Sequence, residues 1–288
     1  MEKKKNYAHS VKQKLLNLAR QGNEDFQVIL TRYGLERFLA RLARSEYAAD
    51  FVLKGAMLFQ IWSKESNRAT RDLDFLSFGR NDIQTLTEIF RRICLIEIEN
   101  DGITFDLTEI KSEKIKADQE YEGVRIQVPA FLERTKIPLR IDVGFGDVVT
   151  PEIREINFPT LLDFPEPEIK IYPPETVVAE KFQALVDLGM SNSRLKDFYD
   201  LYFLTLNFQF ESEILTKAIG ATFERRKTEL PKYLPIALTD EFALDPGKQT
   251  QWKSFLRKSN TSENLELEEV IEHLGDFFGK LLDLRKRL

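Results

Sequence analysis

The nine residues at positions 70–78, Thr-Arg-Asp-Leu-Asp-Phe-Leu-Ser-Phe, carry two acids one residue apart where an apolar segment begins. Side chains alternate between faces along a strand, so Asp72 and Asp74 are predicted to point to the same side. Two carboxylates held that close repel each other unless a cation lies between them, which makes the pair a candidate divalent-metal site. The pair alone is a weak signal, because acidic residues are usually solvated, so its surroundings decide the interpretation.

The composition is that of a globular protein that would hold any metal through oxygen atoms. The chain has 288 residues, 42% of them hydrophobic and 31% charged, enough for one large or two modest domains. Its only cysteine is Cys94 and its only histidines are His9 and His273. These counts argue against an internal disulfide, a zinc centre or a histidine-activated nucleophile. Oxygen ligands favour Mg²⁺, or Mn²⁺ in its place.

Nothing in the sequence predicts a membrane segment. No apolar run approaches the roughly 20 residues that span a bilayer, and the N-terminus lacks the apolar core of a secretory signal. We therefore expect a cytoplasmic protein. The net charge of -5 gives no overall attraction to nucleic acid, although short basic clusters lie at 3–5, 225–227 and 285–287. Such clusters are also common on solvated helix faces.

The first 165 residues are predicted to form an α+β domain. Apolar spacing and breaks predict helices at 8–45 (two, separated at Gly22), 56–62 and 83–94, the last capped by Asp82. Alternating apolar residues predict strands at 103–107, 124–128 and 137–145, beside the strand that carries the acid pair. We expect a mixed or antiparallel sheet.

The rest of the chain, 166–288, is predicted to be a mainly helical C-terminal domain. A proline-rich stretch marks the connection, with prolines at 159, 165, 167, 173 and 174. A helix at 177–188 ends at Gly189, and a second is expected at 195–206. Later apolar residues also recur at helical spacing, and we find no internal repeat.

Asp142 is the candidate third acid. Its strand buries Ile141 and Val143 on one face, so Asp142 projects from the other. If this strand lies beside the Asp72 strand, three carboxylates converge where two ions would stabilise a phosphoryl transfer. The alternative is an acid on the solvated face of a sheet.

Basic residues offer candidate phosphate contacts in both halves of the chain. Gly55 precedes an expected helix, where backbone N–H groups and an absent side chain suit a close phosphate, and Lys54 adds a charge. Lys181 lies in an apolar helical stripe, so it either extends to solvent or meets a buried anion. Lys196 and Asp200 are four residues apart, the spacing of a helical salt bridge.

Five short segments, in this order, are similar to motifs of the AbiEii/AbiGii toxin family. The segments are FVLKGAML at 51–58, RATRDLDF at 68–75, LRIDV at 139–143, VAEKFQAL at 178–185 and RLKDFYDL at 194–201. Each motif is loose, but the five together cover roughly residues 50 to 205. The family comprises nucleotidyltransferase-like toxins of bacterial toxin–antitoxin and abortive-infection (phage defence) systems, with a polymerase-β-type core.

The resemblance implies roles for individual residues. It implies that the metal ligands are Asp72, Asp74 and Asp142. It also implies that Lys181 and Asp200 are further catalytic residues. The candidate nucleotide-binding residues are Lys54, Gly55, Thr70, Arg71, Lys181 and Lys196. The chain departs from the family in having Ala56 after Gly55, where relatives often carry a hydroxyl residue, so one phosphate contact is missing.

The predicted function is Mg²⁺-dependent transfer of a nucleoside monophosphate from an NTP to an acceptor. The resemblance implies the 3′ end of tRNA as acceptor, a block on translation, and a cognate antitoxin with or without a stable direct complex. Two alternatives stay open. The acceptor could be a protein or small-molecule hydroxyl, or the chain could be a catalytically weak interaction module in which the acids only support the fold.

Overall fold

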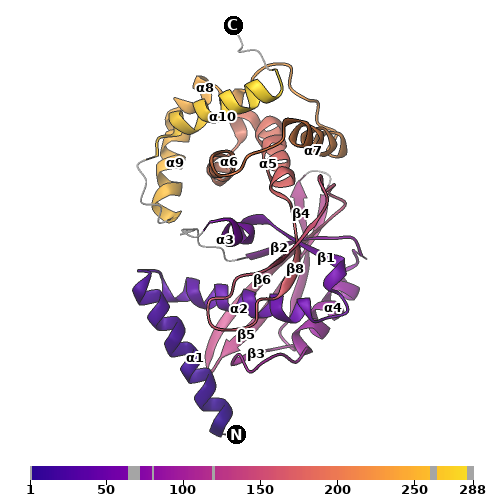
Figure 1. Cartoon of the computed structure of the whole chain (residues 1–288), viewed down its shortest axis with the longest axis vertical. Coiled ribbons are helices and arrows are strands. Elements are labelled where there is room, and N and C mark those ends of the chain that lie inside the picture. Colours follow the sequence, from indigo (N-terminus) through magenta and orange to yellow (C-terminus); the bar gives the residue numbers. More distant parts are fainter. Residues whose placement is uncertain (1, 64–71, 80, 119–120, 260–264, 284–288) are drawn as a thin grey trace. The chain divides into compact units, whose positions relative to one another are not determined.

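The computed structural model describes residues 2–63, 72–79, 81–118, 121–259 and 265–283 (Figure 1). The chain divides into two compact units. Unit 1 comprises residues 1–146 and 154–171, and unit 2 comprises residues 147–153 and 172–288. Separate domains at 1–165 and 166–288 stay a prediction, and each unit is described by itself.

Unit 1 is built on a mixed sheet of eight strands, in the order β3-β5-β6-β2-β1-β8-β7 with β4 added on β5. The bounds are β1 Phe51–Lys54, β2 Asp72–Ser77, β3 Ile103–Phe105, β4 Lys111–Asp118, β5 Tyr121–Leu132, β6 Thr135–Phe145, β7 Arg154–Asn157 and β8 Glu168–Ile171. The β2–β6 and β1–β8 pairs are parallel, and the other pairs are antiparallel. Both the α/β mixture and the mixed sheet agree with the sequence-based expectation.

Alternation along the strands gives the sheet one apolar face, and helices cover that face. In β6, Ile137, Leu139, Ile141 and Val143 are buried, while the residues between them are exposed or half-buried. The helices of unit 1 are α1 Glu2–Gln21, α2 Phe26–Ala43, α3 Phe59–Trp62 and α4 Ile83–Leu95. A Cβ on Gly34 of α2 would lie 2.8 Å from Leu139, so α2 packs directly on β6.

Aromatic rings fill the space between the helices and the strands. Phe38 of α2 stacks on Phe90 of α4 with ring centroids 5.4 Å apart, and Phe90 meets the edge of Phe51 of β1 at 5.5 Å. Phe51 also meets Phe75 of β2. Such contacts stabilise by about 0.5–1.5 kcal/mol each beyond the burial of the rings. Because Phe75 points into this core, its neighbour Asp74 must point to the opposite, polar face.

A cluster of buried charges joins α2 to two later segments of unit 1. Arg41 donates to Asp101 at 2.7 Å, and Glu36 accepts the backbone N–H of Leu161 at 2.7 Å. The guanidinium of Arg37 lies 4.5 Å from the centre of the Phe164 ring. Burial raises the pKa of the Glu36 carboxyl to about 7, against the opposing effects of the Leu161 N–H and Arg37.

The described part of unit 2 is helical. Its helices are α5 Pro174–Leu188, α6 Leu195–Asn207, α7 Ser212–Arg225, α8 Asp240–Ala243, α9 Pro246–Ser259 and α10 Leu267–Leu281. Phe182 of α5 stacks on Phe278 of α10 with centroids 4.0 Å apart. Gly189 ends α5 with a positive φ of 48°, as its sequence position predicts.

Some elements differ from the sequence-based expectation. Strands β4 and β7 were not predicted individually, and β8 lies where only a proline-rich connection was expected. Of the basic cluster at 225–227, Arg226 is a structural residue, because it donates to Gln183 at 2.8 Å and lies 3.5 Å from Asp147. Among the described residues, no helix has the length and hydropathy to cross a bilayer.

Candidate active site

Four charged residues lie side by side across the polar face of the sheet in unit 1. Asp74 of β2 is the register partner of Lys54 on β1 and of Asp142 on β6. Asp142 in turn is the partner of Arg125 on β5. We call Lys54, Asp74, Asp142 and Arg125 the acid row. The expectation that the Asp142 strand lies beside the Asp74 strand is confirmed.

Asp142 is held in place by Arg125. The guanidinium Nε and Nη2 each donate to one carboxylate oxygen of Asp142 at 2.8 Å, in a two-pronged pair. The side chains are 29% and 19% exposed, so the pair is partly shielded from water. The hydrogen bonds to Asp142 raise the pKa of Arg125. Charge-assisted pairs of this geometry are stronger than neutral hydrogen bonds, so Asp142 has a fixed orientation.

Arg125 was not among the sequence-predicted site residues. Its strand alternates around Val124 and Ile126, which places Arg125 on the polar face together with Asp142. The β5–β6 register then decides which acid it meets. The signal was therefore present in the alternation, but it needed the hairpin register to become specific.

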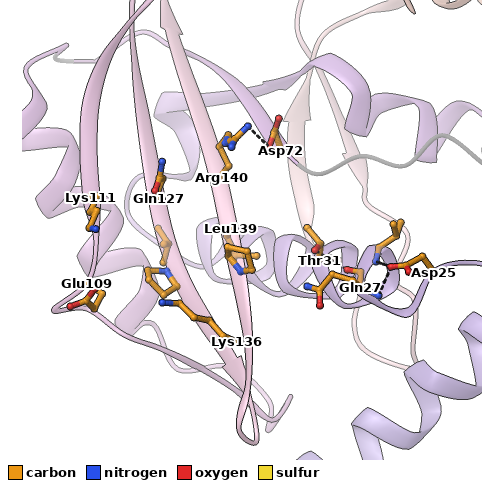
Figure 2. A pocket seen from close by; sticks show the side chains of 14 residues that line it. Asp25, Gln27, Thr31, Asp72, Glu109, Lys111, Gln127, Lys136, Leu139 and Arg140 are labelled. Atoms are coloured by element: carbon orange, nitrogen blue, oxygen red, sulfur yellow. Dashed lines mark hydrogen bonds and ion pairs between the residues drawn. The ribbon is translucent and has the colours of Figure 1, made fainter. Parts of the chain in front are cut away.

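Asp72 lies on the same face as Asp74 but is less constrained. Its carboxylate is 3.7 Å from Arg140 of β6, and the two side chains are 38% and 48% exposed (Figure 2). Ion pairs this exposed contribute about 0–1 kcal/mol. Asp72 can therefore change partners at low cost.

Gly55 makes room for Asp74. Its φ of +74° is a conformation that other residues rarely adopt, and a Cβ there would lie 2.8 Å from Cγ of Asp74. The glycine was predicted to admit a phosphate. The structure gives it a further role, because any larger residue would push the Asp74 carboxylate out of the acid row. The neighbouring Ala56 is half-buried at the beginning of a short 3₁₀ turn, Gly55–Leu58.

The residues present fit a divalent cation of the magnesium type. Mg²⁺ is usually bound in proteins through one or two carboxylates together with substrate phosphates. Asp72 and Asp74 supply such a pair on one face. Within the described ranges, no three acidic, histidine or cysteine side chains are grouped closely enough to hold a metal by themselves. Asp142 is bound to Arg125, so its predicted role as a third ligand remains a prediction.

In unit 2, Lys181 meets two carboxylates. Its Nζ lies 2.5 Å from Asp197 and 2.8 Å from Asp200, both on α6. We call these three residues the lysine trio. Asp200 is 1% exposed and Asp197 8%, so Lys181 meets buried anions rather than extending to solvent. Burial raises the pKa of Asp197, but Lys181 outweighs that effect and holds the pKa below its usual value.

Asp197 is a member of this cluster that sequence reasoning did not select. Asp197 and Asp200 are three residues apart on a helix, so they share a face, and this spacing was the available signal. Lys196, a candidate nucleotide-binding residue whose spacing also allows a salt bridge with Asp200, is exposed, whereas Asp200 is buried. The predicted catalytic roles of Lys181 and Asp200 stay predictions.

Two predicted nucleotide-binding residues, Thr70 and Arg71, lie outside the described residues. Lys54 is half-buried, and a Cβ on Gly144 of β6 would lie 4.0 Å from its Nζ. The Lys54 ammonium therefore lies over the polar face at the acid row, and its contact with phosphate stays a prediction.

Comparison with known proteins identifies the family of the chain. A family model described as "Nucleotidyl transferase AbiEii toxin, Type IV TA system" matches residues 37–273. The chain belongs to this family of nucleotidyltransferase toxins, and a type IV toxin–antitoxin system implies an antitoxin partner.

Two solved structures from Helicobacter pylori share the fold. One is a candidate nucleotidyltransferase with 20% identity and a TM-score of 0.51, covering 90% of this chain and 96% of that one. The other is JHP933, with 19% identity and a TM-score of 0.51, covering 90% and 93%. No curated protein matches the chain. At these identities the structures support the fold alone.

Proposed function

We propose that the protein transfers a nucleoside monophosphate from an NTP to the 3′ end of tRNA, with Mg²⁺ or Mn²⁺, and thereby blocks translation. One observation carries the proposal: Asp74 and Asp142 are direct neighbours on parallel strands, and Gly55 gives Asp74 the space it needs. A turn and a strand with Asp-x-Asp, followed by a neighbouring strand with a third acid, is the arrangement of a polymerase-β-type core. We place the protein in the cytoplasm as a toxin of phage defence.

The reaction follows from the placement of the charges. The 3′ hydroxyl oxygen of the acceptor forms a bond to the α-phosphorus while the bond to the β-phosphate oxygen breaks, and pyrophosphate leaves. We assign Asp142 to accept the hydroxyl proton, with Arg125 fixing its orientation. Asp72 and Asp74 would hold a divalent ion, whose chemistry when bound would be to offset negative charge on the transferred phosphoryl group.

Each remaining residue has a role in binding. Asp72 and Asp74 would hold the ion, and Lys54 and the Gly55 turn would meet the triphosphate. The ammonium of Lys181 would contact a triphosphate while Asp197 and Asp200 hold it in position. Lys196 lies on the exposed face of α6, so its ammonium can reach an anionic ligand.

The test is incubation of the purified protein with each α-labelled NTP, Mg²⁺ and total tRNA. Asp74→Asn is the inactive control, and Asp163→Asn, at an exposed position of unit 1, is the matched control. Label on tRNA from the wild type and from Asp163→Asn, but not from Asp74→Asn, is the expected result.

Two other outcomes assign the alternatives. Label on protein would make a protein hydroxyl the acceptor, an option that the acidic net charge of -5 favours. No transfer from the folded wild type to any acceptor would make the chain an interaction module. The Ala56 departure, which removes a phosphate-binding hydroxyl, favours this last option.

A further inference from the structure

A hollow opens on the polar face of unit 1 and begins at Asp72. It has a volume of about 500 Å³ and extends along β6, β5 and β4 toward the N-terminus of α2 (Figure 2). Residues 135–139 of β6 have no β2 partner among the described residues, and the N-terminus of α2 lines the hollow together with Lys136, Pro138 and Leu139. We call this the strand hollow. None of the roles given above uses it beyond Asp72.

Three cations line the strand hollow: Lys111 on β4, with Lys136 and Arg140 on β6. All three are exposed, so their charges face the space rather than the core. Three carboxylates also line the hollow. Asp25 accepts the N–H groups of Gln27 and Val28 as the cap of α2, Asp72 pairs with Arg140, and Glu109 is exposed. Because Arg140 is paired with Asp72, Lys111 and Lys136 are the two cations of the lining that can best meet an anionic ligand.

The wall between these cations is apolar and flat. Pro129 of β5 and Pro138 of β6 are register partners, so their rings lie next to each other on this face. Gln127 lies two residues before Pro129 and therefore on the same face, with an amide that can donate and accept. An apolar platform next to an amide and flanked by cations is suited to a planar base attached to a phosphate.

We propose that the strand hollow binds the terminal nucleotides of a single-stranded polynucleotide acceptor, with Lys111 and Lys136 contacting its phosphates. This deepens the proposed function and rests on it, because an acceptor in the hollow would present its 3′ hydroxyl at Asp72. Grooves for single strands combine basic side chains along the backbone with surfaces against which bases lie.

The size of the hollow and its lysines favour a short nucleotide strand over a duplex or a basic peptide. About 500 Å³ is a small-ligand volume, suited to one or two nucleotides rather than to a duplex. A basic peptide would bring like charges against Lys111, Lys136 and Arg140, which disfavours it. Ribose and deoxyribose strands share the recognised chemistry, so the experiment below must separate them.

The test compares Lys111→Ala/Lys136→Ala with the wild type and with Lys217→Ala/Lys232→Ala, which removes two exposed lysines from unit 2. Binding of a fluorescent eight-nucleotide RNA with a free 3′ hydroxyl is followed by anisotropy over a range of salt concentrations. DNA of the same sequence and a neutral hydroxyl-bearing peptide are the other probes. NTP binding is measured in parallel.

We expect the strand-hollow variant to bind RNA roughly tenfold more weakly, with a slope of log affinity against log salt about 1.4 smaller, because two phosphate contacts are lost. NTP affinity and the unit 2 variant should be unchanged. RNA bound more tightly than DNA assigns the acceptor to RNA, and the reverse order assigns it to DNA. Either order of affinity supports the proposal that the strand hollow binds a polynucleotide acceptor.

Equal RNA affinity in both lysine variants, or tighter binding of the peptide, would overturn the strand-hollow proposal. Failure of the proposed function has a different signature. If no nucleotide is transferred to any acceptor, but RNA binding still depends on Lys111 and Lys136, the strand-hollow proposal is supported and the proposed nucleotide transfer is wrong. If transfer occurs with the same acceptor KM in every variant, the transfer stands and the hollow does not.

Discussion

The acid row of unit 1 and the lysine trio of unit 2 contain the same kinds of charges in different surroundings. Asp72, beside the row, is 38% exposed and Asp142 is 19% exposed, whereas Asp200 is 1% exposed. Exposed carboxylates can exchange a weak partner for a cation or a ligand, while buried ones must keep theirs. The acids of unit 1 are therefore suited to binding, and those of unit 2 to holding one lysine in place.

The largest effect should come from Asp74→Asn. The substitution removes one charge from the acid row but keeps the shape of the side chain, so we expect nucleotide transfer to fall by about 10³-fold, as for the loss of one essential electrostatic group. The melting temperature should change little. Transfer rates under saturating NTP and a thermal melt measure the two effects, with Asp163→Asn as the matched control. A loss of nucleotide transfer of less than tenfold would contradict the binding role assigned to the acids of unit 1.

Lys181→Met tests the structural role of the lysine trio in unit 2. The change leaves two buried carboxylates without their cation, so we expect the free energy of unfolding at pH 7 to fall by about 3 kcal/mol. Lys217→Met, at an exposed position of α7, should change it by less than about 0.5 kcal/mol. Urea unfolding gives both values.

The difference in unfolding free energy between the wild type and Lys181→Met should depend on pH. Lys181 lowers the pKa of Asp197 in the folded state, so its stabilisation is present above the unfolded pKa and is lost as pH falls through the folded pKa. The difference between the wild type and Lys181→Met should therefore shrink below about pH 4. A difference that grows in acid would contradict the assigned pairing.

Glu36 is a buried carboxyl in unit 1. It shows that burial, rather than the unit in which a residue lies, decides how a charged side chain behaves. Its folded pKa is about 7, above the ordinary value of 4.5. Between these values the unfolded chain has released the proton that the folded protein still holds, so stability falls as pH rises. We expect about 3 kcal/mol from this group between pH 4.5 and 7. Unfolding of Glu36→Gln over this range should lack that decrease.

Gly55→Ala should destabilise the fold less than Lys181→Met. The positive φ and the overlap with Asp74 predict a loss of about 1–2 kcal/mol. Transfer should fall as well, because Asp74 is displaced. Gly220→Ala in α7 meets nothing within 4 Å and should stabilise by about 0.5–1 kcal/mol. If both variants melt like the wild type, Gly55 does not make room for Asp74.

Local patterns were enough to predict the elements that carry the site. The alternation around Asp142 predicted β6 and its buried face, and Asp82 correctly marked the beginning of α4, because its side chain accepts the Thr85 N–H. Strand β4 was missed because its Lys-Ser-Glu-Lys sequence has no apolar alternation at the edge of the sheet. Strand β8 was missed because it has only four residues and lies between Pro167 and Pro173, and its partner Leu53 is distant in sequence.

The partners of the charged residues needed tertiary structure. The sequence left two options for Lys181, and only the packing of α6 against α5 brings Asp197 and Asp200 to its ammonium. The Arg125–Asp142 pair depends on the register of a hairpin, which a one-residue slip would abolish. Periodicity predicts which face a side chain occupies, but not what it meets there.

The most direct test of the difference between the two acidic clusters is a titration with Mn²⁺ in the presence of a non-hydrolysable NTP, followed by electron paramagnetic resonance. We predict that Asp72→Asn/Asp74→Asn loses Mn²⁺ binding, whereas Asp197→Asn, folded and at the same concentration, keeps the wild-type affinity. Equal binding by the wild type and the Asp72→Asn/Asp74→Asn variant, or loss of the ion in Asp197→Asn alone, would contradict the account.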